Sequence, residues 1–266
     1  MQEYWIYYAV AASLCIGLYW FAQKIKSENP DQSETGFIVY SYIWMWLAWL
    51  VWAHFSWQEI QVLNYHALLY AFLITMCYLL IIKTRLRSLK YLSSSTYFIN
   101  YRILSSLWLI LVWAIFFAES ISIQEAIGII LWFVVFYLLL EKKDKSESTG
   151  DFKKWFVYLL IGSFAVMWVQ WFWKEYALSG ENIFTLMFLQ WIFGVVSAIL
   201  LKQKESLKKI FYVKDMKQGL FLLWAATLFA MATMCNVFSY IWWDLAIVYK
   251  IISYSLFIPI ILSIII

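Results

Sequence analysis

Charged residues are scarce in this chain, making up 14% of its 266 residues, whereas soluble domains contain about 25%. Hydrophobic residues reach 65%, well above the usual proportion of about 45–50%. A water-soluble fold of this length cannot bury so much apolar side chain. The composition therefore excludes a soluble globular domain and predicts an all-α integral membrane protein.

Residues that form disulfide frameworks or metal sites are also few. The three cysteines lie inside apolar runs and have no metal-ligand spacing, and the two histidines have no second ligand nearby: Cys15, Cys77, Cys235, His54 and His66. We expect small buried thiols, no metal site and no cofactor. The phosphate-binding motif G-x-x-x-x-G-K-[ST] does not occur, which argues against a nucleotide-driven pump.

Long apolar runs are what the chain does contain. A spanning helix needs about 20 mostly apolar residues, and the first run has no basic n-region or cleavage site, which favours a retained helix. We predict nine spans, at about 4–22, 37–53, 66–82, 93–118, 126–140, 154–173, 183–201, 218–241 and 245–266.

Basic residues in the connectors predict how these spans are oriented. The first, third, fifth and seventh connectors hold 17 of the 20 lysines and arginines, and the other connectors hold only Lys174. Cytoplasmic loops carry the excess of basic residues. The sequence thus predicts a multi-pass protein of the inner or plasma membrane with an extracytoplasmic N-terminus.

A short internal echo suggests a duplication. The segment 101–105, YRILS, reads again at 249–253 as YKIIS, an offset of 148 residues. Matching connectors carry opposite charge bias: KTRLRSLK (83–90) is basic, whereas its counterpart WWD (242–244) is not. Both features predict an inverted repeat of five helices, with halves at 1–145 and 152–266, and place the working site between the halves.

The chain at this point resembles the drug/metabolite transporter superfamily, in its ten-helix EamA-like branch. The resemblance is carried by the end of the fourth span, 117–119 (FAE), by the connector 120–124, by the opening of the fifth span, 126–128 (AIG), and by Gln23-Lys24 followed by Pro30. It covers nearly the whole chain and implies that helices four and nine line a central cavity.

The same resemblance implies a tenth helix that this sequence does not contain. The counterpart of Glu119 would fall at position 267, one residue past Ile266. We therefore expect a fold of five plus four helices, from a fragment or a shortened member. The basic loops also lie on the opposite connectors from those of many members.

Two basic residues inside spans are the leading site candidates. Arg102 and Lys250 occupy the same repeat position, and a cation within a span costs about 2.5–3.5 kcal/mol on insertion scales. Two such cations in a central cavity would favour an anionic or zwitterionic substrate. The alternatives are side chains that snorkel to a membrane face or a structural pair.

Neighbouring polar residues complete the predicted substrate site. It includes Asn100, Tyr101, Tyr249 and Asn236, beside Gln170 and Gln190. These amides could instead serve interhelical hydrogen bonds. Pro259 lies in the middle of the ninth span and should kink it, either as a hinge or as a static bend.

These features predict a secondary transporter that moves a small metabolite, such as an amino acid or organic anion, by alternating access. No catalytic residues are predicted. The alternatives are an integral-membrane enzyme acting on lipid and a non-transporting membrane scaffold. The expected partners are a small-molecule substrate and the bilayer, without nucleic acid, and a homodimer is compatible with the sequence.

Overall fold

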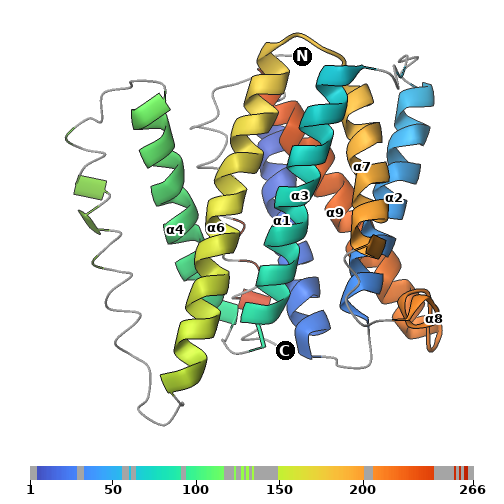
Figure 1. Ribbon diagram of the computed structural model, residues 1–266, viewed down its shortest axis with the longest axis horizontal. Coiled ribbons are helices and arrows are strands. Elements are labelled where there is room, and N and C mark those ends of the chain that lie inside the picture. Colours follow the sequence, from blue (N-terminus) through green and yellow to red (C-terminus); the bar gives the residue numbers. More distant parts are fainter. Residues whose placement is uncertain are drawn as a thin grey trace.

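The computed structural model describes residues 5–28, 33–55, 60, 64–90, 94–116, 149–200 and 206–242, and single positions at 123, 127, 128, 130, 131, 134, 255, 258, 261 and 262. All of the regular secondary structure in these residues is helical (Figure 1). The helices are α1 (Trp5–Glu28), α2 (Glu34–Phe55), α3 (Tyr65–Ser88), α4 (Ser94–Phe116), α6 (Thr149–Leu178), α7 (Ile183–Leu200), α8 (Leu207–Ile210) and α9 (Met216–Trp242).

Six of the described helices are long and apolar enough to cross a membrane: α1, α2, α3, α6, α7 and α9. Their most apolar windows have mean hydropathies from 1.3 to 2.2. The chain is thus a multi-pass α-helical membrane protein. The seven long helices lie where spans are predicted, while most of the predicted fifth and ninth spans fall outside the described residues.

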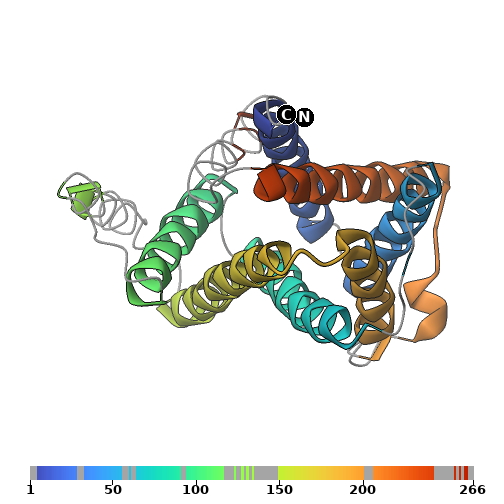
Figure 2. The same ribbon diagram turned by 90° about the horizontal axis from the view of Figure 1, so that it is seen from above.

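The long helices follow one another around a ring when the molecule is seen from above (Figure 2). Going around it, α4 packs on α6, α6 on α3, α3 on α7, α7 on α2, α2 on α9 and α9 on α1. Three smaller contacts, α1 with α3, α6 with α9 and α2 with α3, join long helices that are not neighbours in this order. Helices that are neighbours in this ring are mostly far apart in sequence. The fold is therefore stabilised by contacts between sequence-distant helices rather than by the packing of consecutive helices against each other.

Described residues near the C-terminus lie between α1 and α4. Arg102 Nη2 on α4 donates a hydrogen bond to Ser255 Oγ at 3.1 Å. A side chain at Gly17 on α1 would place its Cβ 2.7 Å from the Ser255 carbonyl oxygen and 2.6 Å from Ile258 Cδ1. Glycine therefore permits this close approach, as small residues do in membrane helix packing.

Hydrogen bonds from buried side chains join helices across the ring. Trp49 Nε1 on α2 donates to the Phe184 carbonyl oxygen on α7 at 3.2 Å, and Thr75 Oγ1 on α3 donates to the Gln190 carbonyl oxygen on α7 at 2.9 Å. Because these helix carbonyls keep a second lone pair, they accept such bonds without losing their own helix bonds. The bonds fix α7 against both of its neighbours.

Several helices run further than the hydropathy pattern predicts, and the extensions of α1 and α3 contribute Gln23 and Arg85. α1 continues through Gln23 to Glu28, and α3 continues through Arg85 to Ser88, although both stretches were predicted as connectors. The segment 83–88, KTRLRS, has no glycine or proline and contains good helix formers. Basic residues in the last turn also interact favourably with the helix dipole. The assignment of Arg85 to a loop is therefore wrong.

Polar residues fasten α3 to the turn between α6 and α7. Asn64 caps α3 by accepting a hydrogen bond from the Ala67 amide at 2.9 Å, and its Nδ2 donates to Glu181 Oε2 at 2.8 Å. His66 Nδ1 lies 2.8 Å from Glu181 Oε1. One carboxylate thus contacts both Asn64 and His66 at this end of α3.

Candidate functional site

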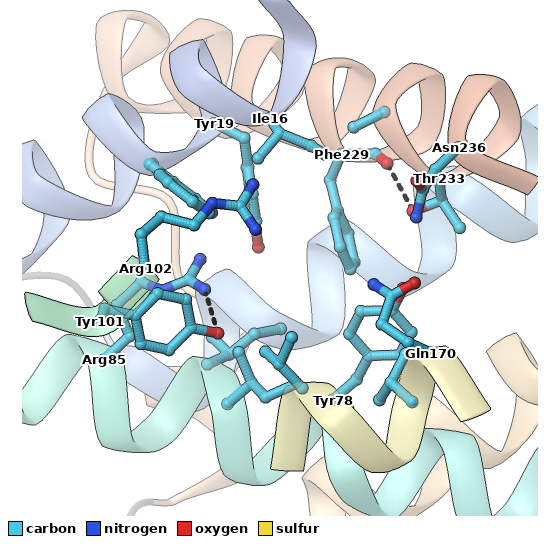
Figure 3. A pocket seen from close by; sticks show the side chains of 16 residues that line it. Ile16, Tyr19, Tyr78, Arg85, Tyr101, Arg102, Gln170, Phe229, Thr233 and Asn236 are labelled. Atoms are coloured by element: carbon cyan, nitrogen blue, oxygen red, sulfur yellow. Dashed lines mark hydrogen bonds between the residues drawn. The ribbon is translucent and has the colours of Figure 1, made fainter. Parts of the chain in front are cut away.

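A cavity lies inside the ring, lined by residues of α1, α3, α4, α6 and α9 (Figure 3). Its volume is about 90 Å³, more than the roughly 10–15 Å³ that one water molecule requires. Its described lining residues are Ile16, Tyr19, Trp20, Tyr78, Ile81, Ile82, Arg85, Tyr101, Arg102, Val166, Val169, Gln170, Phe229, Ala232, Thr233 and Asn236. Two of them are arginines and none is acidic.

Arg85 reaches the cavity from the last turn of α3. Its side chain is 4% exposed. Nη1 donates to Gln23 Oε1 at 2.9 Å and Nη2 donates to Tyr101 Oη at 3.0 Å. The guanidinium carbon also lies 4.8 Å from the centroid of the Trp20 ring. Gln23, Tyr101 and Trp20 are uncharged, so these contacts orient the guanidinium without neutralising it.

Arg102 reaches the same cavity from α4 and is 3% exposed. Its bond to Ser255 Oγ draws it toward the C-terminal segment, and its guanidinium carbon lies 5.1 Å from the Trp20 ring centroid. It lines the cavity together with Arg85. This placement favours the substrate-site prediction for Arg102 over a side chain that snorkels to a membrane face.

The indole ring of Trp20 contacts the guanidinium groups of both arginines. Because each guanidinium carbon lies near 5 Å from the same ring centroid, the two carbons are at most about 10 Å apart. At that separation two like charges repel by about 1.7 kcal/mol for an effective dielectric constant near 20. The negative face of the indole offsets part of this repulsion. An anion in the cavity would offset more of it.

The opposite side of the cavity carries uncharged polar groups from α6 and α9: Gln170, Thr233 and Asn236 (Figure 3). Thr233 Oγ1 donates to the Phe229 carbonyl oxygen at 2.8 Å. Gln170 Oε1 is buried and accepts no hydrogen bond from the described residues. A buried acceptor without a partner is costly in a protein interior, so Gln170 is suited to bind a donor inside the cavity.

The structure brings together part of the predicted site. Arg102, Tyr101 and Asn236 line the cavity. Asn100 is fully buried on α4 but is not among the residues that line it. The predicted residues Lys250, Tyr249 and Pro259 lie outside the described part of the chain.

The sequence prediction missed Arg85, which lines the cavity, and Gln23, which accepts a hydrogen bond from it. Both were counted as connector residues because they follow the most apolar part of their spans. The helical spacing of Tyr78, Ile81 and Arg85, at i, i+3 and i+7, puts all three on one face. Continuing the helix past Lys83 would have placed Arg85 on the buried face.

The residues that the structure describes contain no group of three His, Cys, Asp or Glu side chains placed to hold a metal ion. The cavity's hydrogen-bond donors are guanidinium, amide and hydroxyl groups, which can bind anions and neutral polar groups. The described lining of the cavity is thus chemically suited to a polar occupant.

Comparison of the sequence with protein-family models and with curated proteins finds no match in either case. Function is therefore inferred from the fold and the cavity.

Proposed function

We propose that this chain is a secondary transporter that moves a small metabolite by alternating access, with the substrate held in the central cavity between two inverted halves. The halves would be residues 1–145 and 152–266, arranged as in the EamA-like branch of the drug/metabolite transporters. Nine spans in a cell membrane and an extracytoplasmic N-terminus belong to the same proposal.

The order of helices around the ring is the observation that carries the proposal. The offset of 148 residues takes α1 onto α6, α2 onto α7, α3 onto α9, and α4 onto the segment that contains Ser255. If each helix is replaced by its partner, the contact of α1 with α9 becomes a contact of α6 with α3, and both contacts are observed. In the same way the contact of α2 with α9 becomes that of α7 with α3, and both are again observed. The contact of α2 with α7 maps onto itself.

Two further contacts obey the same exchange, whereas the small contact of α2 with α3 has no counterpart of equal extent between α7 and α9. The contact of α1 with α3 becomes that of α6 with α9. The packing of α4 on α6 becomes that of the C-terminal segment on α1, where Gly17 meets Ser255 and Ile258. A duplicated unit packed around a twofold axis would give this pattern, and the pattern supports a repeat with the offset that the echo at 101–105 defines.

The cavity has the location that such a repeat predicts. Ile81 and Phe229 are 148 residues apart and both line it, and so do Arg85 and Thr233. Transporters with inverted repeats bind their substrates at the interface of the repeats, near the bilayer midplane. At the position of Arg85 the exchange replaces an arginine by a threonine.

Transport in proteoliposomes tests this proposal. Purified protein would be reconstituted with a trapped pool of unlabelled metabolites and screened for counterflow of labelled amino acids, organic acids and sugars. We expect saturable uptake of at least one compound, lost in Arg85→Gln and retained in Arg87→Gln. Arg87 lies two residues along α3, against the Tyr158 ring at 5.7 Å, and does not line the cavity.

Folded protein that moves no compound would contradict the proposal and favour a scaffold. Turnover of lipid by the same preparation would favour an enzyme instead.

A further inference from the structure

The two sides of the cavity differ in chemistry, and this difference restricts the ligand (Figure 3). One side presents the guanidinium groups of Arg85 and Arg102, and the other presents Gln170, Thr233 and Asn236. The walls between them are apolar, formed by residues such as Val166, Val169 and Phe229. A matching ligand has one charged end and one uncharged polar end.

The charged end of the ligand must be negative. Both guanidinium groups are buried, and a negatively charged ligand end would add a charge of opposite sign to the hydrogen bonds that Arg85 and Arg102 already make. The fork of an arginine matches a carboxylate or a phosphate in two parallel hydrogen bonds. The hydrogen bonds from Arg85 to Gln23 and Tyr101 hold its plane in place before a ligand arrives.

The other end of the ligand must be neutral. Gln170 Oε1 needs a hydrogen-bond donor, which either a hydroxyl or an ammonium could supply. An ammonium would be buried near two arginines with no carboxylate among the described lining residues, and an unpaired buried charge is strongly unfavourable. A hydroxyl can bond to Gln170 without that penalty.

The size of the cavity limits the ligand further. Its volume of about 90 Å³ is well below the roughly 300–1,000 Å³ of pockets for drug-sized molecules. A skeleton of about three or four carbon atoms is the appropriate scale.

We propose that the cavity binds a small organic anion, a carboxylate or phosphate monoester, whose other end carries uncharged hydroxyl groups, and that it rejects amines. This inference rests on the proposed transport function for its biological meaning, but binding can be measured without transport. It narrows the substrate from anions and zwitterions to anions alone, and it gives Arg85 the main role in recognition.

Four compounds with one three-carbon skeleton separate the possibilities: glycerol, glycerate, glycerol 3-phosphate and serine. Serine differs from glycerate by an ammonium in place of the hydroxyl at the second carbon. Binding to purified full-length protein in detergent would be measured by titration calorimetry and by the shift in melting temperature. We expect glycerate or glycerol 3-phosphate to bind, and both glycerol and serine to bind at least about tenfold more weakly.

The same titrations on matched variants locate the site. Arg85→Gln should weaken anion binding by about tenfold or more, since the loss of 1.4 kcal/mol is a factor of ten, and Arg87→Gln should leave it unchanged. Gel filtration and unliganded melting temperature establish that each variant is folded, and Arg85→Lys, which keeps the charge, should retain part of the affinity.

The inference would be overturned if serine bound as tightly as glycerate. It would also be overturned if folded Arg85→Gln bound the anions with unchanged affinity, or if neither glycerate nor glycerol 3-phosphate bound to the protein. Counterflow of amino acids with no anion binding would leave the transporter proposal intact while removing this one. Anion binding without flux of any compound would support this inference and contradict the transporter proposal.

Discussion

Arg102 Nη2 donates a hydrogen bond of 3.1 Å to Ser255 Oγ, and the two residues lie 153 positions apart in the chain. Both side chains are buried, so this bond fastens α4 to the C-terminal segment inside the ring. A bond to a charged group contributes about 1.5–3 kcal/mol. It therefore makes a measurable difference to how α4 is held against Ser255.

Ser255→Ala should lower the free energy of unfolding in detergent micelles by about 1.5–3 kcal/mol, because Arg102 keeps its charge and loses an acceptor. The matched control is Ser163→Ala. Ser163 is equally buried, but its hydroxyl donates within its own helix to the Leu160 carbonyl oxygen. An equal decrease in the free energy of unfolding in both variants would show that the hydrogen bond from Arg102 to Ser255 contributes no more than a bond within a helix.

Trp20→Leu should destabilise the protein because the indole supports two guanidinium groups. The ring also stacks on Phe98, with centroids 4.9 Å apart. A desolvated cation–π contact contributes about 2 kcal/mol, so the unfolding free energy should fall by at least that amount.

The control for Trp20 is Trp168, its counterpart at the offset of 148 residues. Trp168 packs against Phe164, Trp171 and Phe172 of its own helix and does not line the cavity. Trp168→Leu should shift the melting temperature less than Trp20→Leu. A larger shift for Trp168→Leu would contradict the role given to Trp20.

Hydropathy locates the long helices well but not their ends. α2 and α7 begin and end within a few residues of the predicted spans, because in lipid the backbone must satisfy its own hydrogen bonds over a fixed apolar length. The end of α3 depends instead on what surrounds it. Arg85 remains helical and buried because Gln23, Tyr101 and Trp20 receive its guanidinium.

The candidate site was predictable only in part for the same reason. Arg102 stands out as a lone cation inside an apolar run, and that signal is local. Arg85 is surrounded in sequence by Lys83, Arg87 and Lys90, so it looks like one more loop charge. The helical spacing of Tyr78, Ile81 and Arg85 marks its face of the helix, but the side chains of α1 and α4 that receive its guanidinium cannot be read from that spacing.

Thiol labelling tests the predicted orientation of the chain. Ser179 lies in the exposed turn after α6, and Lys208 lies on the exposed helix α8. In intact cells, a membrane-impermeant maleimide should label Ser179→Cys and leave Lys208→Cys unlabelled until the cells are broken. The reverse pattern would place the N-terminus in the cytoplasm.

The most direct test of alternating access uses Ala232, a small residue that lines the cavity. Ala232→Cys would be made after Cys15, Cys77 and Cys235 are replaced by alanine, and exposed to an impermeant thiol reagent in right-side-out and in inverted vesicles. Ala71→Cys, a fully buried position on α3 outside the cavity, is the control and should react in neither. The account predicts that Ala232→Cys reacts in both vesicle preparations, since the cavity opens to each side in turn. Reaction in only one preparation, or in neither, would contradict it.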